Sequence, residues 1–223
     1  MNLSNEVFER YGVDRISTNI FYGLIGLFVV YGLGGTAFVA HQLALIHYMP
    51  NGWEKIIFGL VVPFAGIFLA LTSEKPILSF IGYNMVLVPF GVILAPIVNH
   101  YRPEIIERAF MITGGATLVM MFVSLLAPKF FSSIGSALFI ALLGLLCVKI
   151  AENIFPFLEE MTWIDYVAGG IFCLYIGYDM WRARNVQRTL DNAIDIALAL
   201  YLDILNLFLI ALSGGKKSSS SSY

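Results

Sequence analysis

The sequence predicts an all-α, polytopic membrane protein, and three observations predict it: a high apolar content, few charges and long uncharged runs. Of the 223 residues, 59% are hydrophobic and only 13% are Asp, Glu, Lys or Arg, and the mean hydropathy is +0.82. A soluble domain carries about 25% charged residues, since its surface must be polar, so this class is excluded. The net charge of −2 provides no basic excess for nucleic acid, so we expect no nucleic-acid partner.

Five uncharged runs come close to or exceed the ~20 residues that a helix needs to cross a bilayer. Counted between formal charges, they hold 38 residues (Arg15 to Glu54), 18 (Lys55 to Glu74), 26 (Lys75 to Arg102), 20 (Arg108 to Lys129) and 19 (Lys129 to Lys149). The runs are continuous and lack the alternation of a barrel strand, so they predict helices. Two further segments, 163–181 and 193–212, are apolar except for Asp residues and raise the predicted number of spans to seven.

The predicted organisation has three parts. Residues 1–19 form a cytoplasmic N-terminal segment, residues 20–212 the seven-helix domain, and residues 213–223 a disordered or appended tail. No cleavable signal peptide is expected, because the first apolar run is too long for one. Cations in the loops favour a cytoplasmic N-terminus. With that orientation the inner segments hold Arg10, Arg15, Lys75, Lys129, Arg182, Arg184 and Arg188, and the outer ones Lys55, Arg102, Arg108, Lys216 and Lys217.

Carboxylates inside the apolar segments are the most informative residues. Asp203 has twelve uncharged residues after it and seven before it, back to Asp195. An ionised Asp at a helix centre costs ~2.5–3.5 kcal/mol, and such residues usually face the bundle interior and mark a function. The alternative for Asp203 is a neutral carboxyl group that hydrogen-bonds across a helix contact.

Asp179 is the second such carboxylate, near the end of segment 163–181. An ion pair with Arg182, three residues on, is its structural alternative. The short polar connection to the last helix predicts that the two helices are antiparallel neighbours. On straight helices Asp179 lies roughly 6 Å from that connection and Asp203 roughly 15 Å, so helix tilt or a water-filled vestibule must bring them level.

Two carboxylates a few ångströms apart in a low dielectric cannot both ionise cheaply, so they share one proton. The shared proton ties their helices together, and its loss leaves two repelling anions. Those oxygen atoms suit Ca²⁺, a hard cation. The pair Asp179 and Asp203 would then act as a pH sensor and gate, and as transient Ca²⁺ ligands.

Other polar residues carry weaker hypotheses. Asp191 and Asp195 lie at the entrance of the last helix, where they favour helix capping and could recruit cations. We expect secondary polar contacts from Asn206, Tyr178 and His41. Three scattered His and two Cys show no metal-ligand spacing, and no nucleotide-binding or metalloprotease motif is present, so we expect neither a cofactor nor an enzyme.

The stretch DIALALYLDILNLF, from Asp195 to Phe208, resembles the C-terminal signature of the Bax inhibitor-1 (TMBIM) family. The dipeptide Tyr178-Asp179 matches the other acidic position of that family. The segment 89–97 and the sequence Gly-Gly-Ala-Thr at 114–117 are similar to helices of its bacterial members, including those that modulate a membrane-bound AAA protease.

The resemblance implies a seven-helix bundle with six helices around a central seventh. It also implies a pH-sensitive Ca²⁺ leak channel in which Asp179 and Asp203 are the sensor, with Ca²⁺ as permeant ion rather than cofactor. Some bacterial relatives latch the aspartates with an Arg on the second helix, but residues 56–73 hold no cation here. Short loops and the bacterial-type helices indicate a bacterial inner membrane.

Two other functions compete with a cation leak. One is a non-conducting interaction protein that regulates a membrane-bound AAA protease or cell-death factors, favoured by the similarity of the middle helices. The other is an intramembrane aspartyl protease, which would need both carboxyl groups at one water molecule. The glycine-flanked second motif of such enzymes is missing before Asp203, which argues against proteolysis.

Overall fold

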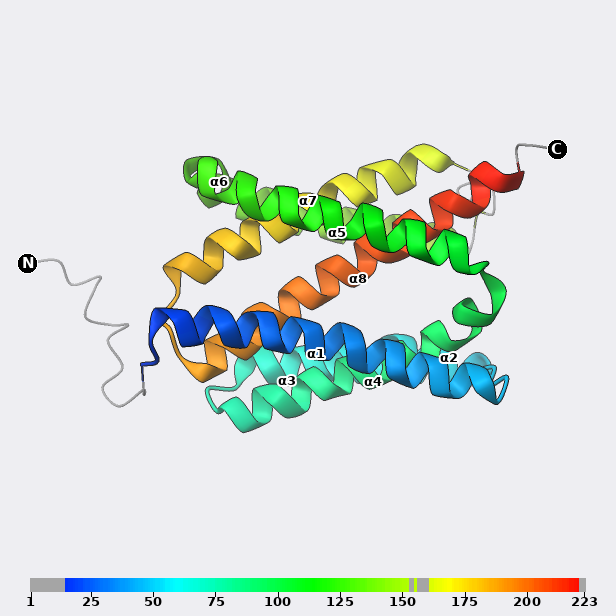
Figure 1. Ribbon diagram of the computed structural model, residues 1–223, viewed down its shortest axis with the longest axis horizontal. Coiled ribbons are helices and arrows are strands. Elements are labelled where there is room, and N and C mark those ends of the chain that lie inside the picture. Colours follow the sequence, from blue (N-terminus) through cyan, green and yellow to red (C-terminus); the bar gives the residue numbers. More distant parts are fainter. Residues whose placement is uncertain (1–14, 153–154, 156–160, 221–223) are drawn as a thin grey trace, which may run out of the picture.

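The computed structural model describes residues 15–152, 155 and 161–220, and that part of the chain is helical without strands. Where the residues between them are described, short connections join successive helices, as the uncharged runs predict. They are α1 (Thr18–Leu45), α2 (Gly52–Ile56), the π-helix η1 (Ile57–Val61), α3 (Val62–Thr72), α4 (Pro76–His100), α5 (Pro103–Leu126), α6 (Pro128–Glu152), α7 (Thr162–Asn185) and α8 (Leu190–Ser220). Figure 1 shows them as one elongated bundle.

Six of the helical segments are long and apolar enough to cross a membrane: α1, the continuous α2–η1–α3 segment, α4, α5, α6 and α8. The prediction of a multi-span membrane protein is therefore confirmed. The described residues contain six candidate spans, one fewer than predicted. Helix α7 is long enough at 24 residues, but it contains Asp165, Asp179, Arg182 and Arg184, which lower its hydropathy. This is the helix that carries half of the predicted aspartate pair.

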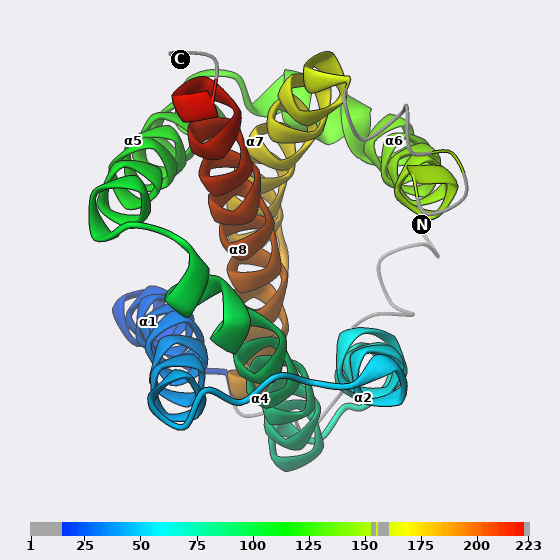
Figure 2. The same cartoon turned by 90° about the vertical axis from the view of Figure 1, so that its right-hand side faces the viewer.

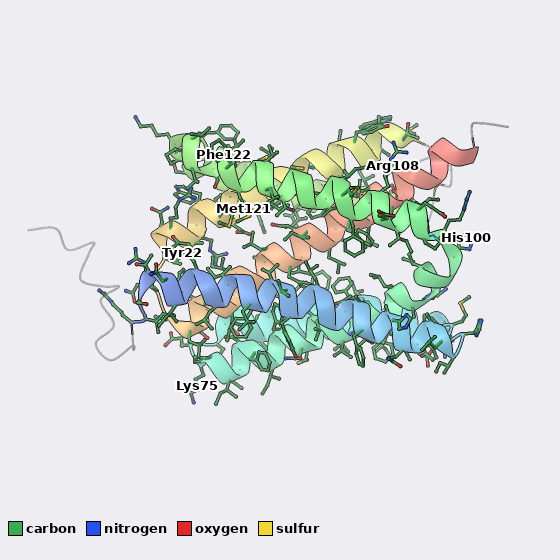
Figure 3. All side chains as sticks on the ribbon, viewed as in Figure 1. Tyr22, Lys75, His100, Arg108, Met121 and Phe122 are labelled. Atoms are coloured by element: carbon green, nitrogen blue, oxygen red, sulfur yellow. The ribbon has the colours of Figure 1, made fainter. Side chains whose placement is uncertain are left out.

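Two opposite ends of the bundle can be distinguished. The first, here called the α7–α8 loop end, holds the start of α1 and the turn between α3 and α4, and Figure 3 shows Lys75 there and His100 at the other end. The backbone N–H of Ile16 donates to the carbonyl of Arg188 at 2.9 Å, which joins the start of the described chain to the α7–α8 loop. Five of the cations that favour an inside orientation lie on segments at this end: Lys75, Lys129, Arg182, Arg184 and Arg188.

Helix α8 crosses the bundle obliquely, between α1 and α4 on one side and α5 and α7 on the other (Figure 2). Its hydrophobic residues take part in two clusters. One includes Ile176 of α7 and Ile196 of α8, and the other includes Tyr83 of α4 and Tyr201 of α8. Helix α3 packs on α4, and α6 packs mainly on α7. The principal neighbours of α8 are thus four helices, whereas the resemblance implied six.

Close helix contacts depend on glycine where α3 meets α4. An added Cβ on Gly66 would lie 2.6 Å from the carbonyl oxygen of Gly82, and one on Gly82 would lie 2.9 Å from the Ala70 backbone nitrogen. Real Cβ atoms do not approach backbone atoms this closely, so the two backbones touch. The second span is also irregular just before this contact: Pro63 cannot donate a backbone hydrogen bond, and the π-helical turn precedes it.

Side chains tie the helices together at other points. The Thr36 hydroxyl of α1 lies 2.6 Å from the Tyr201 hydroxyl of α8 and donates to the Leu87 carbonyl of α4. Arg184 of α7 donates to the side chain and the carbonyl oxygen of Ser124, in the last turn of α5. A cation there satisfies a helix C-terminus, where carbonyl groups lack partners within the helix.

Helix α8 runs past residue 212, the predicted end of the seven-helix domain. It continues to Ser220, so the first part of the segment predicted as a disordered or appended tail is helical. Extending an existing helix costs far less than starting one, and the two glycines do not end it. Residues 221–223, and residues 1–14 of the predicted cytoplasmic segment, lie outside the described part of the chain.

Candidate functional site

The two predicted aspartates meet between α7 and α8. Asp179 is 4% exposed and Asp203 is 7% exposed, and their carboxyl groups lie within hydrogen-bonding reach of each other. Two carboxylates make a hydrogen bond only when one of them carries a proton. The structure therefore places a pair of acids where one shared proton can join two helices.

Local packing explains how the aspartates meet despite their different depths. Leu207 and Ile210 of α8 lie beside Gly169 of α7, which sets the antiparallel register of the two helices near their other ends. From that register, Asp179 is about one helical turn closer to the connecting loop than Asp203. Figure 2 shows α7 and α8 inclined to each other, and side chains from the two helices can span a difference of this size.

Arg182 is the cation next to the pair. Its guanidinium nitrogen lies 4.0 Å from the nearer carboxylate oxygen of Asp179, three residues earlier on α7. The same guanidinium interacts electrostatically with Asp195 of α8. The i, i+3 ion pair, the structural alternative for Asp179, therefore exists together with the Asp179–Asp203 contact, and the charge of Arg182 also acts on Asp195 of the second helix.

Tyr175 is a site residue that sequence reasoning missed. It lies one turn before Asp179 on α7 and interacts electrostatically with both carboxyl groups. The i−4 spacing from Asp179 is the signal that could have found it, since residues four apart share one face of a helix.

Two buried carboxylate oxygen atoms of α8 lack protein partners among the described residues. One carboxylate oxygen of Asp203 and one of Asp195 are fully shielded and accept no hydrogen bond from the described residues. Asp195, predicted at the helix entrance, is only 8% exposed, in the second turn of α8. Buried polar atoms are rarely left unpartnered, and each one needs an explanation.

Asp191 has a different role from the capping that was predicted. The Thr189 hydroxyl caps α8 by accepting the backbone N–H of Asn192 at 3.1 Å. The carboxylate of Asp191 instead accepts a hydrogen bond from the fully buried Ser79 hydroxyl of α4 at 2.6 Å. This contact joins residues 112 positions apart and fixes the start of α8 against α4.

The three residues expected to make secondary polar contacts lie apart from the pair. Asn206 is half-buried, and its side chain donates to the Leu202 carbonyl one turn earlier at 2.8 Å. Tyr178 packs toward α6, where an added Cβ on Gly135 would meet its hydroxyl at 2.8 Å, and its ring lies by Trp181. His41 lies on the exposed side of α1 rather than in the bundle interior.

The arrangement can hold a proton or present oxygen ligands to a hard cation through Asp179 and Asp203. Within the described residues, no group of three or more His, Cys, Asp or Glu side chains converges as in a resident metal site. Any cation at the pair would have to complete its shell of 6–8 oxygen atoms from water or from neighbouring neutral groups.

Comparison with known proteins identifies the family. Residues 16–213 match the family described as inhibitor of apoptosis-promoting Bax1. The chain belongs to this family. It is 26% identical over 163 residues to the inner membrane protein YbhL of Escherichia coli, a match that covers 69% of this chain and 68% of YbhL.

Viral and animal relatives belong to the same set of matches. The chain is 32% identical over 117 residues to the Golgi anti-apoptotic protein of vaccinia virus, which covers 52% of this chain and 48% of the viral protein. It is 28% identical over 158 residues to protein lifeguard 4 of Mus musculus, covering 67% and 65% of the two chains. This Bax inhibitor-1 family member is a multi-pass integral membrane protein, and its candidate spans and its likeness to YbhL place it in the bacterial inner membrane.

Proposed function

We propose that this protein is a pH-sensitive leak channel for cations, Ca²⁺ in particular, gated by the Asp179–Asp203 pair. The observation that supports it most directly is the buried contact between the two carboxyl groups, one from each of two neighbouring helices. Acids buried between helices are costly, and ionisable residues at such positions usually mark a function.

The proposed mechanism follows from the charge on the pair. At acid pH a shared proton makes a hydrogen bond between α7 and α8 and keeps the path closed. When the proton leaves, two anions face each other in a medium of low dielectric constant, and their repulsion weakens the helix contact. The same anions then offer oxygen ligands to a divalent cation. Flux therefore rises with pH.

Neighbouring groups set the conditions for this transition. Arg182 offsets negative charge at Asp179 and Asp195, while Tyr175 interacts electrostatically with both members of the pair. In the proposed channel α8 is the central helix, and Asp191 and Asp195, toward the α7–α8 loop end, attract cations to a cytoplasmic mouth. Other cations compete with Ca²⁺ for this path, and no catalytic step is involved.

The experiment is Ca²⁺ release from proteoliposomes measured between about pH 5 and pH 8. Wild-type flux is expected to rise with pH, because ionisation of the pair opens the path. The double variant Asp179→Asn, Asp203→Asn keeps the shape of both side chains but cannot ionise. Its flux is expected to show no pH dependence over this range.

Glu104→Gln provides the matched control, because it makes the same kind of change at a carboxylate whose side chain is 71% exposed. Its pH profile should follow the wild type. A wild-type protein that releases no Ca²⁺ at any pH would refute the channel. A double variant with the wild-type pH profile would refute the role of the pair.

A second candidate is a non-conducting protein that binds other membrane proteins, such as a membrane-bound AAA protease or cell-death factors. The name of the vaccinia virus relative, Golgi anti-apoptotic protein, favours it. Capture of the detergent-solubilised protein from its own membranes tests this function. Recovery of a protease or a death regulator by a protein that is silent in the flux assay would favour the second candidate over the first.

A further inference from the structure

Helix α5 contributes two buried hydroxyl groups that the proposed mechanism does not yet use. Thr113 is 3% exposed, and its hydroxyl and that of Thr117 are fully shielded without a hydrogen-bond partner among the described residues. Residues four apart lie on one face of a helix. The stripe continues through Ala109, which is buried, and Met120, whose side chain lies beside Gly177 of α7. It therefore faces the bundle interior.

The depth of these hydroxyls can be read from neighbouring contacts. Phe110 of α5 lies against Phe208 of α8 with ring centroids 4.7 Å apart. The two helices run in opposite directions, and Figure 3 shows Arg108 toward the end of α5 where α8 terminates and Phe122 toward the other end. At 1.5 Å per residue, Thr113 lies about 4.5 Å and Thr117 about 10.5 Å beyond Phe110. Asp203 lies about 7.5 Å beyond Phe208 in the same direction, between the two depths.

Four buried side-chain oxygen atoms of the described residues lack protein partners, and all four lie on α5 and α8. They belong to Thr113, Thr117, Asp195 and Asp203. Asp195 is two turns, about 12 Å, from Asp203 toward the α7–α8 loop end. An unpartnered hydroxyl in an apolar interior costs free energy, whereas Val of the same shape would not. Two hydroxyls lie near the depth of Asp203, and the two carboxylates lie along one helix. Unpartnered polar atoms placed in this way are suited to binding water or an ion.

We infer that the Thr113 and Thr117 hydroxyls supply neutral oxygen ligands to a divalent cation held at Asp203, in a hydrated path that continues to Asp195. This inference rests on the proposed channel function. It adds α5 to the helices that line the cation path. A cation such as Ca²⁺ takes 6–8 oxygen ligands, of which the aspartate pair supplies only a part. Two hydroxyls at the depth of Asp203 supply more without adding charge.

The test is the double variant Thr113→Val, Thr117→Val, assayed for Ca²⁺ release at the pH of maximal wild-type flux and for thermal unfolding in detergent. Valine keeps the branched shape and removes the oxygen. Flux is expected to fall about tenfold, the effect of losing roughly one good hydrogen bond to an ion. The unfolding temperature is expected to stay level or rise, because no protein partner is lost. The pH midpoint should stay, since the aspartate pair is intact.

Thr72→Val is the control, because the Thr72 hydroxyl is exposed and bonds only the Phe68 carbonyl of its own helix. It should conduct like the wild type. Wild-type flux from the double valine variant, beside a wild-type protein that conducts, would overturn the inference and leave the channel standing. A lowered unfolding temperature would also overturn it, since it would show that the hydroxyls hold the fold together. A silent wild-type protein would instead refute the channel itself.

Discussion

The Gly82→Ala variant is expected to unfold at a clearly lower temperature than the wild type, with a loss of about 3 kcal/mol in the free energy of unfolding. The added Cβ would overlap the carbonyl oxygen of Gly66 and come within 2.9 Å of the Ala70 nitrogen. Both are backbone atoms of α3, so relief requires the two helices to move apart. Thermal unfolding in detergent, followed by tryptophan fluorescence or circular dichroism, measures the effect.

Gly114→Ala provides the matched control in another membrane helix. A Cβ at Gly114 would meet nothing within 4 Å. Alanine has the higher helix propensity, so this variant should unfold at or slightly above the wild-type temperature. Equal stability of the Gly82→Ala and Gly114→Ala variants would contradict the close backbone contact between α3 and α4.

The same contrast explains how far the sequence could predict the fold. Apolar run lengths predicted seven spans, and six of them are long and apolar enough in the described residues, because crossing the bilayer sets the length of a helix without reference to its neighbours. They could not distinguish Gly82, which touches another backbone, from Gly114, which faces open space. They also could not predict the π-helical turn before Pro63, since several local arrangements can accommodate a proline in a membrane helix.

Some of the candidate site could also be predicted from the sequence, and some could not. The cost of charge in a membrane pointed to Asp203 from the sequence alone, whereas Asp179 was predicted from the short connection between the two helices and from the family resemblance. Their contact depends on how α7 and α8 cross, which straight-helix geometry did not capture. Tyr175 could have been found from its spacing to Asp179. No local signal could have linked Ser79 to Asp191, because they are 112 positions apart in the chain and their contact depends on the packing of α4 against α8.

Replacing Arg182 with glutamine is expected to move the rise of Ca²⁺ flux to higher pH by about one unit. The guanidinium lies 4.0 Å from Asp179 and acts on Asp195 as well, so its charge favours the ionised form of buried acids on both helices. Without it, the shared proton is held more tightly and leaves only at higher pH. The shift is modest because the Arg182 side chain is 38% exposed and water screens part of its charge. The pH profile of flux from proteoliposomes measures it.

Two further variants test whether the effect of Arg182 comes from its charge and from its place beside Asp179. Arg182→Lys keeps the charge and should restore most of the wild-type profile. Arg188→Gln removes one charge from the same end of the bundle, in the α7–α8 loop, and should leave the midpoint in place because no interaction joins its side chain to either aspartate among the contacts of the described residues. A shift of equal size in Arg182→Gln and Arg188→Gln would mean that general surface charge, rather than the pairing at Asp179, sets the pH of opening. Arg182 on α7 would then have no specific part in gating. Because the second span has no arginine either, gating would depend on the proton shared by the two aspartates alone.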